Sequence, residues 1–425
     1  MEKELRDKIE ALIRREVVLA TGCTEPGAVA LCVAKACELL GCEPEHVELK
    51  LSKNVFKNAM GVGIPGTGMI GLPIAVAMAV TAGRTERQLE VLNITDAEMA
   101  ASKQWLVEKG SRIAIGVKEQ CDKLYIECTC TADSQSATAV IAKRHTNFVT
   151  LRRNGETLLD TNAQAGQEQQ QQGATDVELN EKMVYEYATT APIEELSFIR
   201  ETVRYNSAAS AEGLKGYGLN AGKILMQNAH GDVVHKTVAA TVAASDARMD
   251  GCTLPIYSNS GSGNQGITCT LPVYEYGMAH GCTEEQITRA LVLSHLTSIY
   301  VKRGIGRLSA LCGIVNASIG VTSALTYLQG GTFDQIGYAI KNLINTLAGM
   351  VCDGAKPSCA LKMSTGLYSA FVSSELAVHN RVVDATDGLS EKDVDYSIGN
   401  LGRLGHDGMN ETDDIVLEIM THKHQ

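Results

Sequence analysis

The chain has 425 residues, of which 44% are hydrophobic and 20% charged, the balance of an ordinary globular protein with a sizeable core. Its net charge of −11, without clusters of basic residues, argues against nucleic acid or an anionic membrane as the main partner. The most apolar run, residues 69–82, contains glycine and proline and is shorter than the roughly 20 residues of a membrane span.

The first part of the chain is predicted to mix helices and strands. Helical spacing of apolar residues appears at 2–19, 27–40 and 98–109, and alternation typical of a strand at 47–55. A glycine-rich turn at 61–71 leads into an apolar helix. From 111 to 159 the apolar period changes to two, which predicts short antiparallel strands.

The second part of the chain is predicted to be helical. A glutamine-rich stretch at 164–173 indicates a mobile surface loop and a domain boundary. Beyond about residue 177 the strand signal disappears, and helices are predicted at 192–210, 217–227, 234–244, 284–301, 308–328 and 333–347. The predicted fold class is therefore α+β: a mixed α/β region with a small antiparallel sheet (1–176), followed by a mainly helical domain (177–425).

The 13 cysteines and the N-terminal sequence together indicate in which cellular compartment the protein is found. Residues 1–20 carry charges throughout, unlike a signal peptide, so we expect a cytoplasmic protein whose 13 cysteines stay reduced. Thiols there serve core packing, catalysis or metal binding. Cys32, Cys37, Cys121, Cys128 and Cys130 have helix or strand spacing and are interpreted as core residues, as are the single histidines His145 and His295.

Two motifs near the N-terminus have ordinary explanations. Residues 61–66, GVGIPG, match the dinucleotide fingerprint by letter, but Pro65 interrupts it and no βαβ pattern surrounds it; a turn that offers backbone N–H groups to an anion is favoured. Cys23 lies in GCTEP just before a predicted helix, where a thiolate is stabilised. The word GCTE recurs at 281–284 with a capping box, so by itself it indicates a helix start.

A cysteine pair in the second half suggests a metal centre. Cys352 and Cys359 flank a glycine and a proline, which predicts a tight loop. Their spacing is wider than that of structural zinc pairs, whereas iron–sulfur clusters tolerate irregular spacing. Cys312, at the start of a small-residue stretch, is the natural third ligand. Three thiolates would leave one iron open as a Lewis acid; three packed cysteines are the alternative.

The segment 258–266, SNSGSGNQG, contains no core-forming residue yet lies between apolar segments. Its density of N–H, hydroxyl and amide donors favours a nest that binds a carboxylate over a flexible turn. Arg248, just upstream, could add a cation or pair on the surface. The candidate substrate-binding residues are Asn259, Ser260, Gly261, Ser262, Gly263, Asn264 and Gly266.

Taken together, these motifs make the sequence similar to the L-cysteine desulfidase family, which is related to the iron–sulfur-dependent bacterial L-serine dehydratases. The resemblance covers most of the chain and is carried by GCTEP (22–26), PGTGM (65–69), AASDARM (243–249), SNSGSGNQG (258–266), RLSALC (307–312) and the segment 352–359. It implies that Cys312, Cys352 and Cys359 hold a [4Fe–4S] cluster in the helical domain, and that Cys23 is the catalytic base. The glutamine-rich insert departs from the family pattern.

The implied reaction converts L-cysteine and water to pyruvate, ammonia and hydrogen sulfide, a step of cysteine catabolism that needs no pyridoxal phosphate. The α-proton of an amino acid is weakly acidic and needs a positioned base. Cys23 could serve if its pKa is lowered. Two alternatives stay open: an L-serine dehydratase with the same cluster, and a non-catalytic iron–sulfur sensor. The expected partner is a small amino acid, and the oligomeric state, a homo-oligomer included, is left open.

Overall fold

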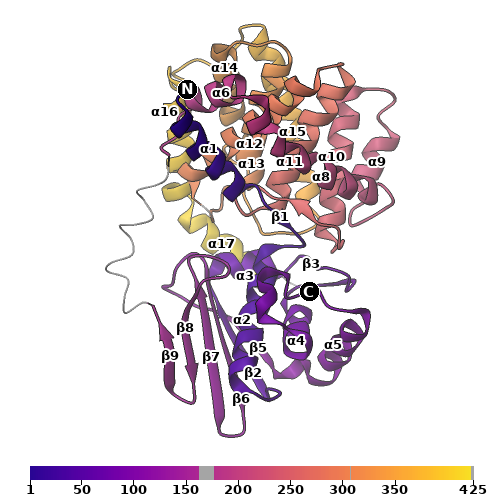
Figure 1. Cartoon of the computed structure of the whole chain (residues 1–425), viewed down its shortest axis with the longest axis vertical. Helices are drawn as coiled ribbons and strands as arrows, with labels where there is room; N and C mark the ends of the chain where they lie inside the picture. The colour runs from indigo at the N-terminus through magenta and orange to yellow at the C-terminus, as the bar shows by residue number, and fades with distance from the viewer. Residues whose placement is uncertain (162–176, 307, 423–425) are drawn as a thin grey trace.

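The computed structural model describes residues 1–161, 177–306 and 308–422. The glutamine-rich stretch 164–173 and the predicted boundary at residue 176 lie outside the described residues. The fold is α+β, as predicted: a mixed sheet with its helices occupies the lower part of the molecule in Figure 1, and a helical part lies above it. No helix in the described part of the chain is long and apolar enough to cross a membrane.

The lower part is built on a six-stranded sheet in the order β5-β2-β6-β7-β8-β9. Its strands are β2 (His46–Leu51), β5 (Ile113–Val117), β6 (Tyr125–Ala132), β7 (Gln135–Ala142), β8 (Phe148–Arg153) and β9 (Glu156–Asp160). The prediction of a wholly antiparallel sheet is wrong at β5, which pairs with β2 in parallel. The helices between these two strands supply the long crossover that a parallel pair needs.

Helices cover one face of this sheet. Helix α2 (Thr24–Leu40) packs on β6 and β7, α4 (Leu72–Ala82) packs on α2, and α5 (Asp96–Lys109) packs on α4. The short helix α3 (Lys53–Ala59) follows β2. The strand predicted to reach residue 55 ends at Leu51, because the Ser52 side chain accepts from Val55 N (3.4 Å) and caps α3. The fingerprint-like segment forms a hairpin of β3 (Gly63–Ile64) and β4 (Met69–Ile70).

The upper part is a bundle around one large apolar core. Its helices are α6 (Glu181–Thr190), α7 (Ile193–Leu196), α8 (Glu201–Gly213), α9 (Ala221–Gln227), α10 (Val233–Met249), α11 (Gly263–Ala279), α12 (Glu284–Ile305), α13 (Gly313–Leu328), α14 (Phe333–Leu347), α15 (Cys359–Val378) and α16 (Val394–Arg403). Sequence periodicity missed α6, α11, α15 and α16. One of these, α11, begins with the Gly- and Asn-rich sequence GNQG, which resembles a loop.

Two terminal segments cross between the parts (Figure 1). Helix α1 (Lys3–Glu16) packs its buried Ile9, Leu12 and Ile13 into the upper core, although it precedes the sheet in sequence. Helix α17 (Asn410–Thr421) descends to contact α3. Strand β1 (Leu19–Ala20) pairs with β10 (Ile256–Tyr257), a short strand beyond residue 177, where none was predicted. The chain just after β1 is thereby held at the junction of the two parts.

Candidate active site

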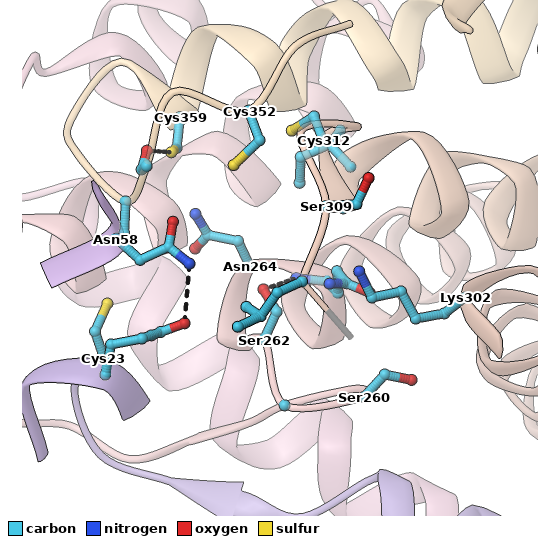
Figure 2. Close-up of a pocket in the computed structure, with 18 of the residues that line it drawn as sticks. Cys23, Asn58, Ser260, Ser262, Asn264, Lys302, Ser309, Cys312, Cys352 and Cys359 are labelled. Carbon is cyan, nitrogen blue, oxygen red and sulfur yellow. Dashed lines mark hydrogen bonds between the residues drawn. The ribbon is translucent and has the colours of Figure 1, made fainter. Parts of the chain in front are cut away.

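A cavity of about 130 Å³ lies at this junction and is lined by residues from both parts. The lower part contributes Cys23, Glu25 and Asn58. The upper part contributes Arg248, the polar segment after β10 and the three candidate ligand cysteines. Figure 2 shows the cysteines Cys359, Cys352 and Cys312 along one wall, with Cys23 on the opposite side.

Cys312 and Cys352 are brought together by a short antiparallel contact. Leu311 and Val351 form an isolated β-bridge. On either side of it, Cys312 N donates to Met350 O (2.9 Å) and Cys352 N donates to Ala310 O (2.7 Å). Two segments far apart in sequence therefore present their thiols side by side, and Cys312 also marks the N-terminus of α13.

Cys359 joins them from the first position of α15, where its sulfur lies 3.6 Å from Gly354 O. The loop between the two cysteines turns at Gly354, which has φ +93°. A Cβ at Gly354 would lie 2.2 Å from Lys57 O, so only glycine fits there. The sequence predicted a tight loop carrying both thiols, but Cys359 already belongs to a helix.

Two lysine side chains, Lys57 and Lys362, contact the backbone next to Cys352. Lys57 Nζ donates to Cys352 O (3.1 Å), and Lys362 Nζ donates to Val351 O (2.8 Å) and to the Asp353 carboxylate. A hydrogen bond from Cys312 holds the pKa of Cys352 below its usual range, and both lysines favour the Cys352 thiolate as well. The Cys352 thiolate is therefore stabilised, whereas the hydrogen bond with Cys352 raises the pKa of Cys312 and burial raises the pKa of Cys359.

The three thiols form a donor set that fits an iron–sulfur cluster. In the part of the chain that the structure describes, no group of three His, Cys, Asp or Glu side chains is placed to hold one metal ion. A cluster distributes its thiolate ligands over different iron atoms, so its ligands need not converge on one point. The all-sulfur donor set and the nearby lysines, which offset the negative charge of thiolates, fit such a group.

Lys57 connects the cysteine loop to the C-terminal helix. Its side chain is buried, with 1% exposed, and pairs with Asp413 of α17, which also accepts from Asn54 Nδ2 (3.1 Å). Lys57→Met would leave the Asp413 carboxylate buried without its cation. We expect a loss of about 3–5 kcal/mol in the free energy of unfolding, measured in urea.

The half-buried neighbour Lys53, which pairs with Glu119 and Asp414, provides the control. Lys53→Met should cost less than about 1 kcal/mol. Adding Asp413→Leu to Lys57→Met should recover most of the stability. A Lys57→Met protein as stable as the Lys53→Met protein would show that the buried pair does not hold the loop.

Cys23 is buried, with 6% exposed, and is the N-cap of α2. Its segment is fixed on both sides: Thr24 Oγ1 donates to Gly261 O (3.3 Å), and Asn58 Nδ2 donates to Glu25 Oε1 (3.1 Å). Burial raises the pKa of Cys23 to about 11, and Arg248 offsets part of this effect. Cys23 is therefore a thiol at neutral pH, and acting as a base requires further positive charge beside it.

This protonation state can be tested by alkylation. With a pKa near 11, the thiolate fraction of Cys23 rises about tenfold per pH unit between pH 7 and 10. The rate of iodoacetamide labelling at Cys23, followed by peptide mass spectrometry in the ligand-free protein, should rise in the same proportion. Glu25 and Cys359 disfavour the thiolate and Arg248 favours it. A labelling rate that is flat above pH 8 would contradict the raised pKa.

The polar segment 258–266 is partly a loop and partly the start of α11. Ser262 caps that helix by accepting from Gln265 N (3.4 Å). Ser260, Gly261, Ser262 and Asn264 line the cavity. The other three predicted binding residues, Asn259, Gly263 and Gly266, do not line the cavity.

Asn259 is fully buried and donates from Nδ2 to the backbone oxygen of His295 (3.1 Å), with Nδ1 of the same histidine also 3.1 Å away. Burial lowers the pKa of His295 to about 3, so this core histidine is neutral, in line with its interpretation from sequence. A Cβ at Gly266 would lie 2.0 Å from Tyr257 O, and one at Gly263 would lie 2.2 Å from Arg248 Nε. These three positions therefore shape the loop.

Several residues that line the cavity were not among those predicted from the sequence. Asn58 and Lys302 line the cavity from helices whose sequence carries no motif, and Ser309 lines it from the segment RLSALC, in which only Cys312 was singled out for a role. His145, interpreted as a core residue, is half-buried and lines the cavity from the turn between β7 and β8. Arg248, for which a surface pair was an alternative, is buried with 8% exposed. Only the packing of the two parts brings these side chains together.

Comparisons with known proteins show which family the chain is similar to. The serine dehydratase alpha chain family matches residues 86–418, a range that includes the three wall cysteines but not Cys23. Relatives named UPF0597 protein are similar along the whole chain. Those of Phocaeicola vulgatus and Bacteroides thetaiotaomicron are each 51% identical, covering 99% and 98% of both chains; that of Bacteroides fragilis is 50% identical over 100% of both.

Proposed function

We propose that this chain, which belongs to the UPF0597 family and carries a serine dehydratase alpha chain domain, is an L-cysteine desulfidase. The reaction would be β-elimination, converting L-cysteine and water to pyruvate, ammonia and hydrogen sulfide. The domain supports the broader class, a lyase that acts on an amino acid. The observation that carries the proposal is the cavity that holds the three wall cysteines opposite a fourth, Cys23.

Cys312, Cys352 and Cys359 would hold a [4Fe–4S] cluster. When bound, a cluster with three protein ligands supplies a Lewis acid that stabilises the charge on a departing sulfur. The chain keeps these thiols where Lys57 and Lys362 offset their negative charge. Pyridoxal phosphate, the usual electrophile for such chemistry, is then not required.

The remaining steps fall to the residues of the chain itself. Cys23 would take the α-proton, and the polar segment 258–266 would orient the carboxylate with its N–H and hydroxyl groups. A positively charged ammonium group arriving beside Cys23 would favour its thiolate. Loss of sulfide leaves aminoacrylate, which tautomerises to an imine and hydrolyses to pyruvate and ammonia in water.

L-Serine dehydration is the second candidate, favoured by the family that matches residues 86–418. The two substrates differ only in the leaving group, hydroxide or sulfide. Anaerobically purified protein assayed in parallel with both amino acids separates the candidates: hydrogen sulfide and pyruvate from L-cysteine at the higher kcat/KM support the proposal. A higher kcat/KM for L-serine would identify the protein as an L-serine dehydratase. If neither amino acid is turned over, the non-catalytic iron–sulfur sensor is the remaining alternative.

A further inference from the structure

Arg248 is a buried cation whose partners in the described structure are all neutral. It lies in the last turn of α10 beside the cavity and donates from Nη1 to Asn264 Oδ1 and from Nη2 to Gly22 O, both at 3.2 Å. Its Nε is buried and has no hydrogen-bond acceptor. Among the residues described, no carboxylate forms an ion pair with this guanidinium.

An unpaired buried charge is costly, because water no longer solvates it and no counter-ion replaces the water. The fold nevertheless makes room for it: Gly263 lies so close to the guanidinium that any side chain there would collide with Nε. Guanidinium groups match carboxylates in shape and bind them strongly. The natural compensation for Arg248 is therefore a carboxylate that enters the cavity with a ligand.

Glu25 supplies the opposite charge on the same cavity. Its carboxylate accepts from Asn58 Nδ2 (3.1 Å), and no Lys, Arg or His in the described part of the chain pairs with it. It lies in the first turn of α2, two residues after Cys23. Arg248 favours the Cys23 thiolate and Glu25 disfavours it, so both charges act on the same sulfur without pairing with each other.

We propose that Arg248 and Glu25 form a clamp for a zwitterion, in which Arg248 binds the α-carboxylate of the substrate and Glu25 binds its α-ammonium group. The Cα that joins these two groups is then held beside Cys23. This inference rests on the proposed function and specifies its substrate class: free α-amino acids, as opposed to their amides, their N-acylated forms or simple carboxylic acids.

The test measures binding and does not depend on turnover. L-Alanine carries both charges but no leaving group, propionate lacks the ammonium group, and L-alaninamide lacks the carboxylate. Calorimetric titration of the anaerobically prepared holoprotein should give a Kd for L-alanine about 10- to 150-fold lower than for either analogue, as expected when a charge-assisted contact is lost.

Two variants that each remove one charge should each remove one preference. The Arg248→Gln protein should bind L-alanine about as weakly as it binds L-alaninamide. It should still bind L-alanine more tightly than propionate. Glu25→Gln keeps an oxygen for Asn58 and should show the reverse pattern. Arg204→Gln and Glu194→Gln, at exposed positions, should keep both preferences.

Equal losses for all three ligands in both variants, or no loss in either, would overturn the clamp. If Arg248→Gln does not fold, Arg248→Lys, which keeps the charge, should fold and retain the preference for L-alanine over L-alaninamide; losing that preference in the folded lysine variant counts against the clamp. If the protein prefers L-alanine to both analogues but turns over neither L-cysteine nor L-serine, only the proposed function is refuted. Turnover without discrimination would refute the clamp alone.

Discussion

Replacing Cys312, Cys352 or Cys359 by serine is expected to abolish turnover together with bound iron. Each thiol lines the same cavity wall, and an alcohol is a poor ligand for iron in a cluster. Wild-type protein prepared without oxygen should contain about four iron and four sulfide per chain. Iron and sulfide analysis, with the visible absorption spectrum, measures the loss in each variant.

Cys128→Ser is the matched control, because Cys128 is also buried but lies in β6, within the core of the sheet. It should keep its iron. If all three wall variants retained full iron, the ligand assignment would be wrong. One equivalent of zinc in place of iron in the wild-type protein would overturn it as well.

Replacing Cys23 by serine should separate catalysis from the cluster. Cys23 lies opposite the cysteine wall, so Cys23→Ser should keep iron and the visible spectrum. A missing general base typically lowers the rate by about 10²–10⁴-fold, and kcat for L-cysteine should fall within this range. Loss of iron in this variant would instead identify Cys23 as a fourth ligand.

The chain contains its own control for this experiment. Cys282 lies in the second copy of the word GCTE, where Thr283 caps α12 in a capping box with Gln286. In the first copy, Cys23 itself is the N-cap of α2 and its side chain makes no cap hydrogen bond. Cys282→Ser should therefore leave kcat unchanged. Equal effects of the two substitutions on kcat would show that Cys23 has no catalytic role and only marks the start of a helix.

Much of the local structure could be predicted from the sequence. Apolar periodicity located α1, α2, α5, α12 and α14, and the change of period marked the strands of the sheet, because both depend on residues a few positions apart. The combination of helices and strands gave the α+β class. Where small polar residues begin a helix, as in α11, the same signals were absent and the helix was missed.

The site depended on contacts between residues far apart in the chain. The bridge of Leu311 with Val351 places two wall cysteines side by side, and the pairing of β1 with β10 carries Cys23 to the cavity. The sequence GCTE occurs at both 22–25 and 281–284, but these long-range contacts place only the first copy at the cavity. The sequence alone determined which residue types were available for chemistry. Which of them meet, and that Arg248 is buried without a counter-ion, was decided by the packing of the two parts, since periodicity records only neighbours along the chain.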